Sequence, residues 1–176
     1  MPRLFVAIRP PSPVREALLD TEGSIDGARW QDDEQLHLTL AFCGEVDGAQ
    51  ADDLVEALAD IQGTAFPAEV AGVGHFERKR AATAVWAAVP LSPPLAQLQG
   101  RVERACRRAS IATDSRTFRP HVTLARLPRS AGPIGGWLAE HGTLRAGPWL
   151  VEGFTLYESH LRDGGSLYLP RVDYEF

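Results

Sequence analysis

The stretch Phe118 to Arg126, FRPHVTLAR, places a histidine, a threonine and an arginine close together on a segment with the composition of a β-strand. A shorter version of it, HLTL, occupies His37 to Leu40. The two histidines lie 84 residues apart, close to half of the 176-residue chain. This spacing predicts a duplicated unit, with one copy in each half of the sequence.

In a β-strand, side chains at positions i and i+2 point to the same face. His37 is therefore expected beside Thr39, and His121 beside Thr123, with the intervening apolar residues facing a core. A single pair of this kind is usually a hydrogen-bonded structural feature. Two copies of His-apolar-Thr-Leu among five histidines would arise by chance with a probability on the order of one in ten thousand. The repeat is therefore our candidate catalytic site.

Two neighbouring histidines suit acid-base chemistry on a phosphodiester. Imidazole has an unperturbed pKa near ~6.5, so one ring can accept a proton while the other donates one. A phosphodiester needs a base to deprotonate the attacking water and an acid to protonate the departing sugar oxygen. Threonine hydroxyls and an arginine can hold the phosphate oxygens. Because these donors do the work of a cation, we expect neither a metal nor a cofactor.

The chain resembles the two-histidine phosphoesterases and, within them, the RNA 2′,3′-cyclic phosphodiesterases, also called 2′-5′ RNA ligases. The resemblance covers nearly the whole chain and rests on Arg3 to Ile8, His37 to Val46, Val85-Trp86, Arg116 to Arg126 and Phe154 to Ser159. Cys43 departs from the family, which usually has a leucine there. The resemblance implies an α+β fold, in which two pseudo-symmetric lobes of antiparallel sheet and helices surround a central cleft that carries the paired His-x-Thr strands.

By this resemblance, His37 is the general acid that protonates the leaving ribose oxygen, and His121 is the base that activates water. The sequence alone leaves the two roles interchangeable. The implied phosphate-binding residues are Thr39, Thr123 and Arg126. The implied substrate is RNA with a 2′,3′-cyclic phosphate end, which hydrolysis converts to a 2′-phosphate. A ribose hydroxyl in place of water would form a 2′-5′ linkage reversibly.

Arg126 raises a difficulty, because strict alternation points it away from His121. Either the strand ends or bulges by Ala125, or the Arg126 side chain curls round the strand edge. Arg119 has the right parity but is not the family's usual arginine, and we treat it as a lesser candidate for substrate binding. Arg116 matches a family position, although it could equally be a surface residue that bridges the lobes.

Three aromatic residues in the matched segments are candidates for stacking on substrate bases: Phe5, Phe118 and Tyr157. All three lie in apolar strands, so packing in the core is the competing explanation for each of them. The remaining histidines, His75, His141 and His160, are expected to be structural or exposed.

Alternatives to the cyclic phosphodiesterase remain open. The same fold could act on another ribose-linked phosphodiester, such as a 2′-5′ oligonucleotide or a cyclic phosphate of an ADP-ribose derivative. The chain could also be a non-catalytic module that binds RNA ends. A further alternative is a thiol hydrolase that uses Cys43, which shares the face of His37 by parity.

Length and composition predict one domain over residues 1–176 that contains a sizeable core. No apolar run approaches the ~18 residues of a membrane span, and no signal peptide follows Met1, so we expect a cytoplasmic, monomeric protein. A net charge of −5 excludes RNA binding by bulk electrostatics and requires a local positive patch. Cys43 and Cys106 lie far apart in the sequence and match neither a zinc site nor a disulfide scaffold.

The densest positive cluster, Arg78 to Arg80, falls in a turn between two expected strands, Ala65 to Phe76 and Thr83 to Val89. It is either an ordinary solvated turn or a contact for an RNA backbone.

The remaining elements follow from apolar periodicity and from capping residues. The expected strands are Leu4 to Ile8, Arg29 to Gln31, Leu36 to Cys43, Trp149 to Glu158 and Ser166 to Val172. The expected helices are one from Pro13 to about Thr21 with Ser12 as N-cap, one over Ala49 to Ile61 after Asp47, one from Pro93 with Ser92 as N-cap, and a short one near Trp137 to Glu140.

Overall fold

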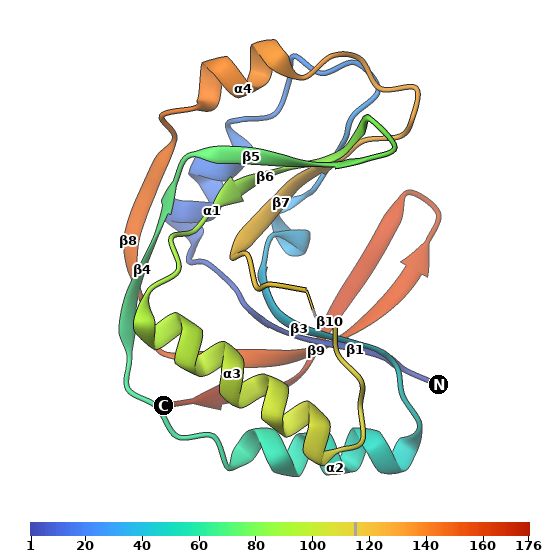
Figure 1. The fold of residues 1–176 in the computed structure, drawn as a ribbon, viewed down its shortest axis with the longest axis vertical. Helices are drawn as coiled ribbons and strands as arrows, with labels where there is room; N and C mark the ends of the chain where they lie inside the picture. The colour runs from blue at the N-terminus through green and yellow to red at the C-terminus, as the bar shows by residue number, and fades with distance from the viewer. Residues whose placement is uncertain (115) are drawn as a thin grey trace.

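The computed structural model describes residues 1–114 and 116–176, and an eight-stranded antiparallel sheet forms its centre (Figure 1). Seven strands follow one another in the order β10-β9-β1-β3-β7-β6-β5, and β2 pairs with β7. The strands are β1 (Arg3–Ile8), β2 (Arg29–Trp30), β3 (Leu38–Glu45), β5 (Val73–Arg78), β6 (Ala81–Ala88), β7 (His121–Arg126), β9 (Gly153–Arg162) and β10 (Gly165–Glu175).

The sheet consists of two groups of strands that meet at its middle. Within the described residues, β3 and β7 pair only at Leu38 and Val122. We call β1, β3, β9 and β10 the first lobe, and β2, β5, β6 and β7 the second lobe (Figure 1). Each lobe therefore contains one motif strand, as predicted. The lobes are not the two halves of the sequence, because the C-terminal strands β9 and β10 complete the sheet that β1 and β3 begin.

Four helices and a small second sheet complete the fold. The helices are α1 (Ser12–Leu19), α2 (Gly48–Ala59), α3 (Pro93–Arg108) and α4 (Gly135–His141), and β4 (Phe66–Ala71) pairs with β8 (Arg145–Val151) outside the main sheet. Helices α2 and α3 pack together below the first lobe, whereas α4 lies at the opposite end of the molecule (Figure 1). The buried Trp137 of α4 donates a hydrogen bond from Nε1 to the carbonyl of Thr21, 2.8 Å away, just after α1. Among the described residues, no helix is both long and apolar enough to cross a membrane.

Capping residues place the starts of two helices as the sequence predicts. Asp47 and Gln50 form a reciprocal capping box at α2, and Ser92 accepts a hydrogen bond from the Leu95 backbone at α3. The predicted N-cap of α1 is wrong by one residue. Pro11 is the N-cap and Ser12 already belongs to the helix, because the Pro11 carbonyl accepts the first helical hydrogen bonds.

Two of the predicted strands are each broken into two. Gly72 separates β4 from β5 with a φ of +88°, and Glu152 separates β8 from β9. In both places the chain leaves the small sheet and enters the large one. At the first of them the backbone has a positive φ, which glycine tolerates. The first motif strand begins at Leu38 rather than Leu36, because a short 3-10 helix, η1 (Asp33–Gln35), precedes it.

The main hydrophobic core lies on one face of the sheet, under the helices. The apolar stripe predicted on α3 is buried there: Leu95, Leu98, Val102, Ala105 and Ala109. A second, smaller cluster of Phe5, Ala7 and Tyr157, with Tyr168 packed on it, is separate from this core. The first lobe therefore has apolar side chains on both of its faces.

Candidate active site

The single pair between β3 and β7 brings the two motifs together. Because the strands are antiparallel, the pairing of Leu38 with Val122 places His37 and Thr123 on one side of this pair, and Thr39 and His121 on the other. All four polar residues are half-buried, while Leu38 and Val122 are buried in the core. We call the face of the sheet that carries His37, Thr39, His121 and Thr123 the histidine face.

The two imidazoles are held in the same way. His37 Nδ1 lies 2.7 Å from the carbonyl oxygen of Gln35, and His121 Nδ1 lies 2.7 Å from that of Arg119. A carbonyl oxygen can only accept, so in each ring Nδ1 carries the hydrogen. In the neutral imidazole, Nε2 is then the atom that can accept a proton. This repeated geometry is what a duplicated unit predicts.

The carbonyl that orients His37 is itself fixed by its surroundings. Gln35 forms a reciprocal capping box with Asp32, and its side-chain amide donates to the carbonyl of Ser166, 2.9 Å away. Arg15 Nε donates to Asp33 Oδ1 at 2.8 Å, which ties η1 to α1. The Gln35 carbonyl is therefore anchored to two other elements, and it limits the rotation of the His37 ring.

Each motif strand carries a β-bulge three residues after its histidine. Leu40 is the extra residue where β3 pairs with β1, and Leu124 is the extra residue where β7 pairs with β6. An extra residue reverses the alternation of the residues that follow it. Arg126 therefore returns to the histidine face, which resolves the difficulty posed by strict alternation. Phe42 is its counterpart in the first motif.

Aromatic rings surround His37. The ring centroids of Phe5, Tyr168 and Tyr157 lie 4.8, 5.1 and 6.5 Å from that of the imidazole. Burial among these rings lowers the pKa of His37 to about 4, although its hydrogen bond to Gln35 acts in the opposite direction. The charges of Arg126 and His121 lower this pKa further. A shift of this size disfavours the charged ring by roughly 3 kcal/mol.

His121 lies in a similar setting, with the ring centroids of Phe76 and Trp86 at 5.0 and 5.5 Å. Burial is again the main cause that lowers its pKa, and the charges of Arg119 and Arg126 contribute. Arg126 thus lies close enough to both imidazoles to act on each of them. The pKa of each imidazole is therefore lowered, so the unliganded site disfavours a proton on either ring.

Binding of inorganic phosphate is expected to raise the pKa of His37 well above its unliganded value of about 4. A phosphate anion stabilises the charged imidazole, so at a fixed mildly acidic pH the protonated fraction of His37 should increase. NMR titration of both histidines, with and without phosphate, measures this directly. If the His37 pKa stays near its unliganded value while that of His121 rises, the acid and base roles implied by the resemblance are reversed.

The other predicted substrate-binding residues lie in different places. Phe5 and Tyr157 are buried and stack on each other beneath His37. Arg119 supplies the carbonyl that orients His121.

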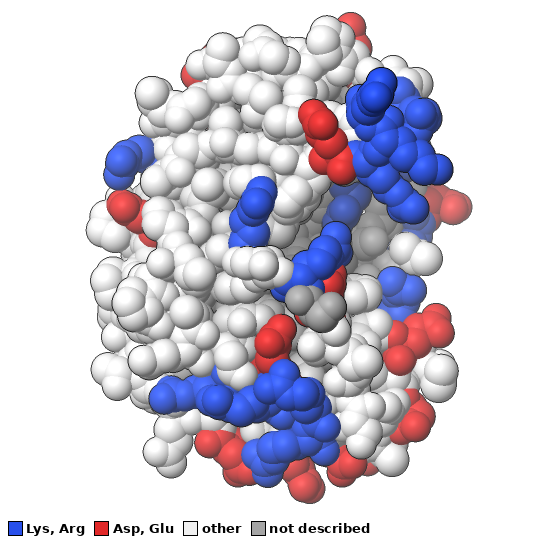
Figure 2. All heavy atoms as spheres, viewed as in Figure 1, with Lys and Arg blue, Asp and Glu red and all other residues white. Residues whose placement is uncertain are grey.

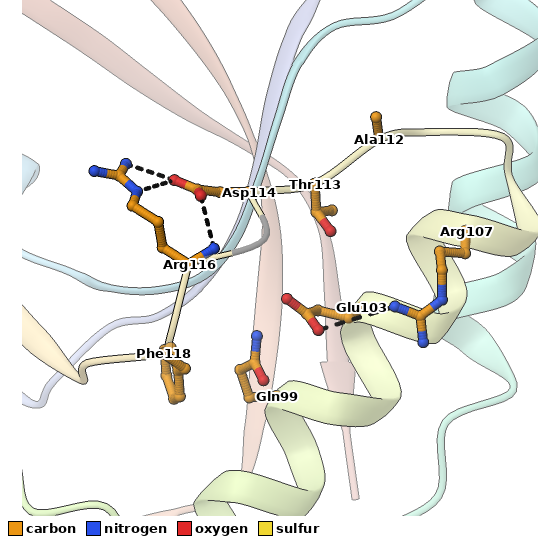
Figure 3. A pocket seen from close by; sticks show the side chains of 8 residues that line it. All are labelled: Gln99, Glu103, Arg107, Ala112, Thr113, Asp114, Arg116 and Phe118. Atoms are coloured by element: carbon orange, nitrogen blue, oxygen red, sulfur yellow. Dashed lines mark hydrogen bonds and ion pairs between the residues drawn. The ribbon is translucent and has the colours of Figure 1, made fainter.

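Arg116 and Phe118 line a surface hollow of about 380 Å³ against α3, which neither histidine lines (Figure 3). Arg116 is bound there by its neighbour Asp114, so the structure does not bring these two residues to the imidazoles.

The alternative of a nucleophilic Cys43 is contradicted. The bulge at Leu40 in β3 turns Cys43 into the core, where it is 8% exposed and its Sγ lies 3.8 Å from that of Cys106. The neighbouring thiol and burial both raise the pKa of Cys43, which disfavours the thiolate that a nucleophile requires.

Several residues of the histidine face were not singled out from the sequence: Arg29, Phe42, Phe76, Trp86 and Tyr168. Trp86 and Phe42 lie in segments that carry the family resemblance, so a signal was present for both. Tyr168 and Phe76 gave none, because only the pairing of β10 and β5 within the sheet brings them to the motifs.

Comparison with known proteins supplies the family. A model of the 2′-5′ RNA ligase superfamily matches residues 11–163. The chain belongs to this superfamily.

Curated relatives in the superfamily carry one description. An RNA 2′,3′-cyclic phosphodiesterase of Aeropyrum pernix is 33% identical over 140 residues, which cover 78% of this chain and 80% of the relative. A protein of the same description from Geobacillus stearothermophilus is 30% identical over 136 residues, covering 74% of this chain and 43% of that longer relative. The chain thus spans less than half of the length of the Geobacillus protein.

Solved superfamily structures share the fold. The Escherichia coli LigT structure in complex with 3′-AMP superimposes with a TM-score of 0.81 at 28% identity, covering 99% of this chain and 98% of that one. The predicted α+β fold of antiparallel sheet and helices is therefore confirmed.

Proposed function

We propose that this protein is an RNA 2′,3′-cyclic phosphodiesterase, which opens the cyclic phosphate at an RNA end to a 2′-phosphate. The observation that carries the proposal is the pair of imidazoles on one face of the sheet. In each ring Nδ1 is hydrogen-bonded to a backbone carbonyl, and the charge of Arg126 acts on both rings. The description shared by the curated relatives supports the same activity.

In the proposed reaction, Nε2 of His121 takes a proton from water, and the water oxygen attacks phosphorus. The bond from phosphorus to the ribose 3′ oxygen breaks, and protonated His37 gives its proton to that oxygen. The products are a 2′-phosphate and a 3′-hydroxyl. When a ribose 5′-hydroxyl replaces water as the attacking group, His121 takes its proton, the bond from phosphorus to the 3′ oxygen breaks with a proton from His37, and a 2′-5′ linkage forms. In the reverse reaction both proton transfers run backwards and the cyclic phosphate is restored.

Thr39, Thr123 and Arg126 would stabilise the negative charge that builds on the phosphate oxygens. Within the described residues, neither threonine hydroxyl has a hydrogen-bond partner in the protein, and Arg126 forms no ion pair, so all three remain available to an anion. Preorganised donors of this kind typically contribute the largest share of such catalysis. Phe5 and Tyr157 would exclude water from His37 rather than stack on a base.

The proposal treats residues 1–176 as one bilobal catalytic domain, because one sheet joins the two lobes and both of them contribute to the site. We further propose that the protein is cytoplasmic. We also propose that it acts as a monomer without a metal or cofactor, since a single chain supplies the acid, the base and the phosphate donors.

Turnover of a nucleoside 2′,3′-cyclic phosphate in excess EDTA tests the proposal. We expect activity to survive chelation and the product to be the 2′-phosphate isomer. The 3′-phosphate as product, or activity that returns only on adding a divalent cation, would contradict it. Binding of RNA with a cyclic phosphate end without any turnover would indicate the non-catalytic alternative, and faster turnover of an ADP-ribose cyclic phosphate would indicate a different substrate class.

A further inference from the structure

The tip of the β5-β6 hairpin is a positive surface that the proposed chemistry does not use. Arg78, Lys79 and Arg80 are consecutive and exposed, and none of them forms an ion pair with any residue that the structure describes. The adjacent Glu77 pairs with His75 instead, with 3.0 Å between Oε1 and Nε2. Figure 2 shows positive side chains gathered over this tip, at the upper right. In a chain of net charge −5, such a cluster requires an explanation.

The turn itself does not call for these residues. Arg78 pairs with Ala81, so Lys79 and Arg80 form a two-residue loop with φ values of 52° and 64°. Hairpin turns with two positive φ angles strongly favour Asn-Gly, because most side chains are strained there. Strained residues of this kind are typically kept where a function needs their side chains. The positive charge, rather than the turn geometry, therefore accounts for the sequence of this loop.

The hairpin is attached directly to the candidate active site. Its ring residues Phe76 and Trp86 pack on His121, and Ala84 of β6 pairs with Arg126. Ala84 lies four positions after Arg80, which corresponds to about 13 Å of strand. The tip therefore lies beyond Arg126, at the end of β7 that points away from His121. Phosphates in a stacked single strand follow one another at ~3.4 Å along its axis, so this distance spans several nucleotides.

Arg29 extends the positive charge on the other side of Arg126. The register of β2 and β7 places the two arginines directly opposite each other, and both are exposed. Like charges at directly opposite positions are destabilising. In the part of the chain that the structure describes, neither arginine has an acidic partner that would relieve this repulsion. An anion between them would relieve it.

We propose that Arg29 and the hairpin tip bind the phosphates of the nucleotides that precede the cyclic end, so that the protein acts on single-stranded RNA chains in preference to mononucleotides. The proposal rests on the proposed function, because it takes the cyclic phosphate to lie between His37, His121 and Arg126. The cyclic phosphate is at the 3′ end of the RNA, so the remaining chain must leave the site on one side. Contacts to phosphates carry no base identity, so the binding is independent of sequence.

The double variant Lys79→Asn/Arg80→Gly tests this inference, because it removes two charges while giving the turn its favoured sequence. Its thermal midpoint should equal or exceed that of the unmodified protein. The probes are a labelled single-stranded oligoribonucleotide of about ten nucleotides with a 2′,3′-cyclic phosphate end, and a nucleoside 2′,3′-cyclic phosphate. We expect oligonucleotide affinity to fall on the order of tenfold and KM for the mononucleotide to stay unchanged. The slope of log affinity against log salt should decrease by about 1.4.

The matched control is Arg104→Gln/Arg108→Gln, which removes the same amount of positive charge from exposed positions on α3. If this control weakens oligonucleotide binding as much as the hairpin variant does, the effect is one of net charge and the inference is wrong. It is also wrong if the hairpin variant binds the oligonucleotide as the unmodified protein does. A failure of the proposed function would give a different result, because the unmodified protein would then turn over neither probe. The binding measurements would still show whether the hairpin tip contacts the oligonucleotide.

Discussion

Replacing His121 with alanine is expected to lower kcat on a nucleoside 2′,3′-cyclic phosphate by ~10²-fold or more, and His37→Ala is expected to do the same. Each substitution removes one of the two imidazoles that move protons in the proposed reaction. The double variant should lose less than the product of the two single effects, since the two histidines act as a unit. Steady-state rates for the three variants measure both expectations.

Loss of packing could imitate this result, because His37 is surrounded by Phe5, Tyr157 and Tyr168. His37→Gln and His121→Gln keep a polar side chain of similar size that cannot transfer a proton, so they should be as inactive as the alanine variants. His160→Ala is the matched control, because His160 is exposed at the far end of β9 beside Glu158. An alanine variant of either motif histidine that keeps a rate close to normal would rule out paired acid-base catalysis.

Replacing Arg126 with alanine is expected to lower kcat/KM by ~10²-fold, because Arg126 is the cation that acts on both imidazoles and faces the proposed phosphate position. Arg126→Lys should recover part of the loss, since lysine restores the charge but not a bidentate contact. An independent readout is available in the unliganded protein. The charge of Arg126 lowers the pKa of both histidines, so both pKa values should rise in Arg126→Ala.

The control for this variant is Arg145→Ala, which removes a surface arginine that pairs with Glu69 on the small sheet, away from the histidines. It should leave both kcat/KM and the two histidine pKa values unchanged. If Arg126→Ala behaves like this control in both measurements, Arg126 does not hold the phosphate, and Arg119 becomes the next candidate.

The placement of Arg126 shows where prediction from sequence reached its limit. The alternation of side chains along a strand indicated only that a bulge, a strand end or a curled side chain was needed to bring Arg126 to His121. A bulge is defined by two residues of one strand opposite one residue of its partner, so its position depends on β6, some forty residues earlier in the chain. The same dependence made the prediction for Cys43 wrong, because the bulge at Leu40, where β3 pairs with β1, turns its thiol into the core.

Helix starts and the polar pairs of the motifs were predictable because they depend on neighbours within a few residues. Ser92 caps α3 through the backbone three residues later, and the Asp47-Gln50 box is equally local. The prediction for α1 failed by one residue, since a proline carbonyl can begin a helix without any side-chain cap.

The sequence by itself therefore determined the two His-x-Thr strands, the family and the candidate acid, base and phosphate-binding residues, because each of these is a short pattern of neighbouring side chains. Only the tertiary structure decided which strands complete each lobe, where the bulges fall, and that Arg29, Phe76, Trp86 and Tyr168 border the motifs. These features depend on backbone pairing between segments far apart in the chain. Such pairing depends on contacts throughout the sheet and therefore leaves no local pattern in the sequence.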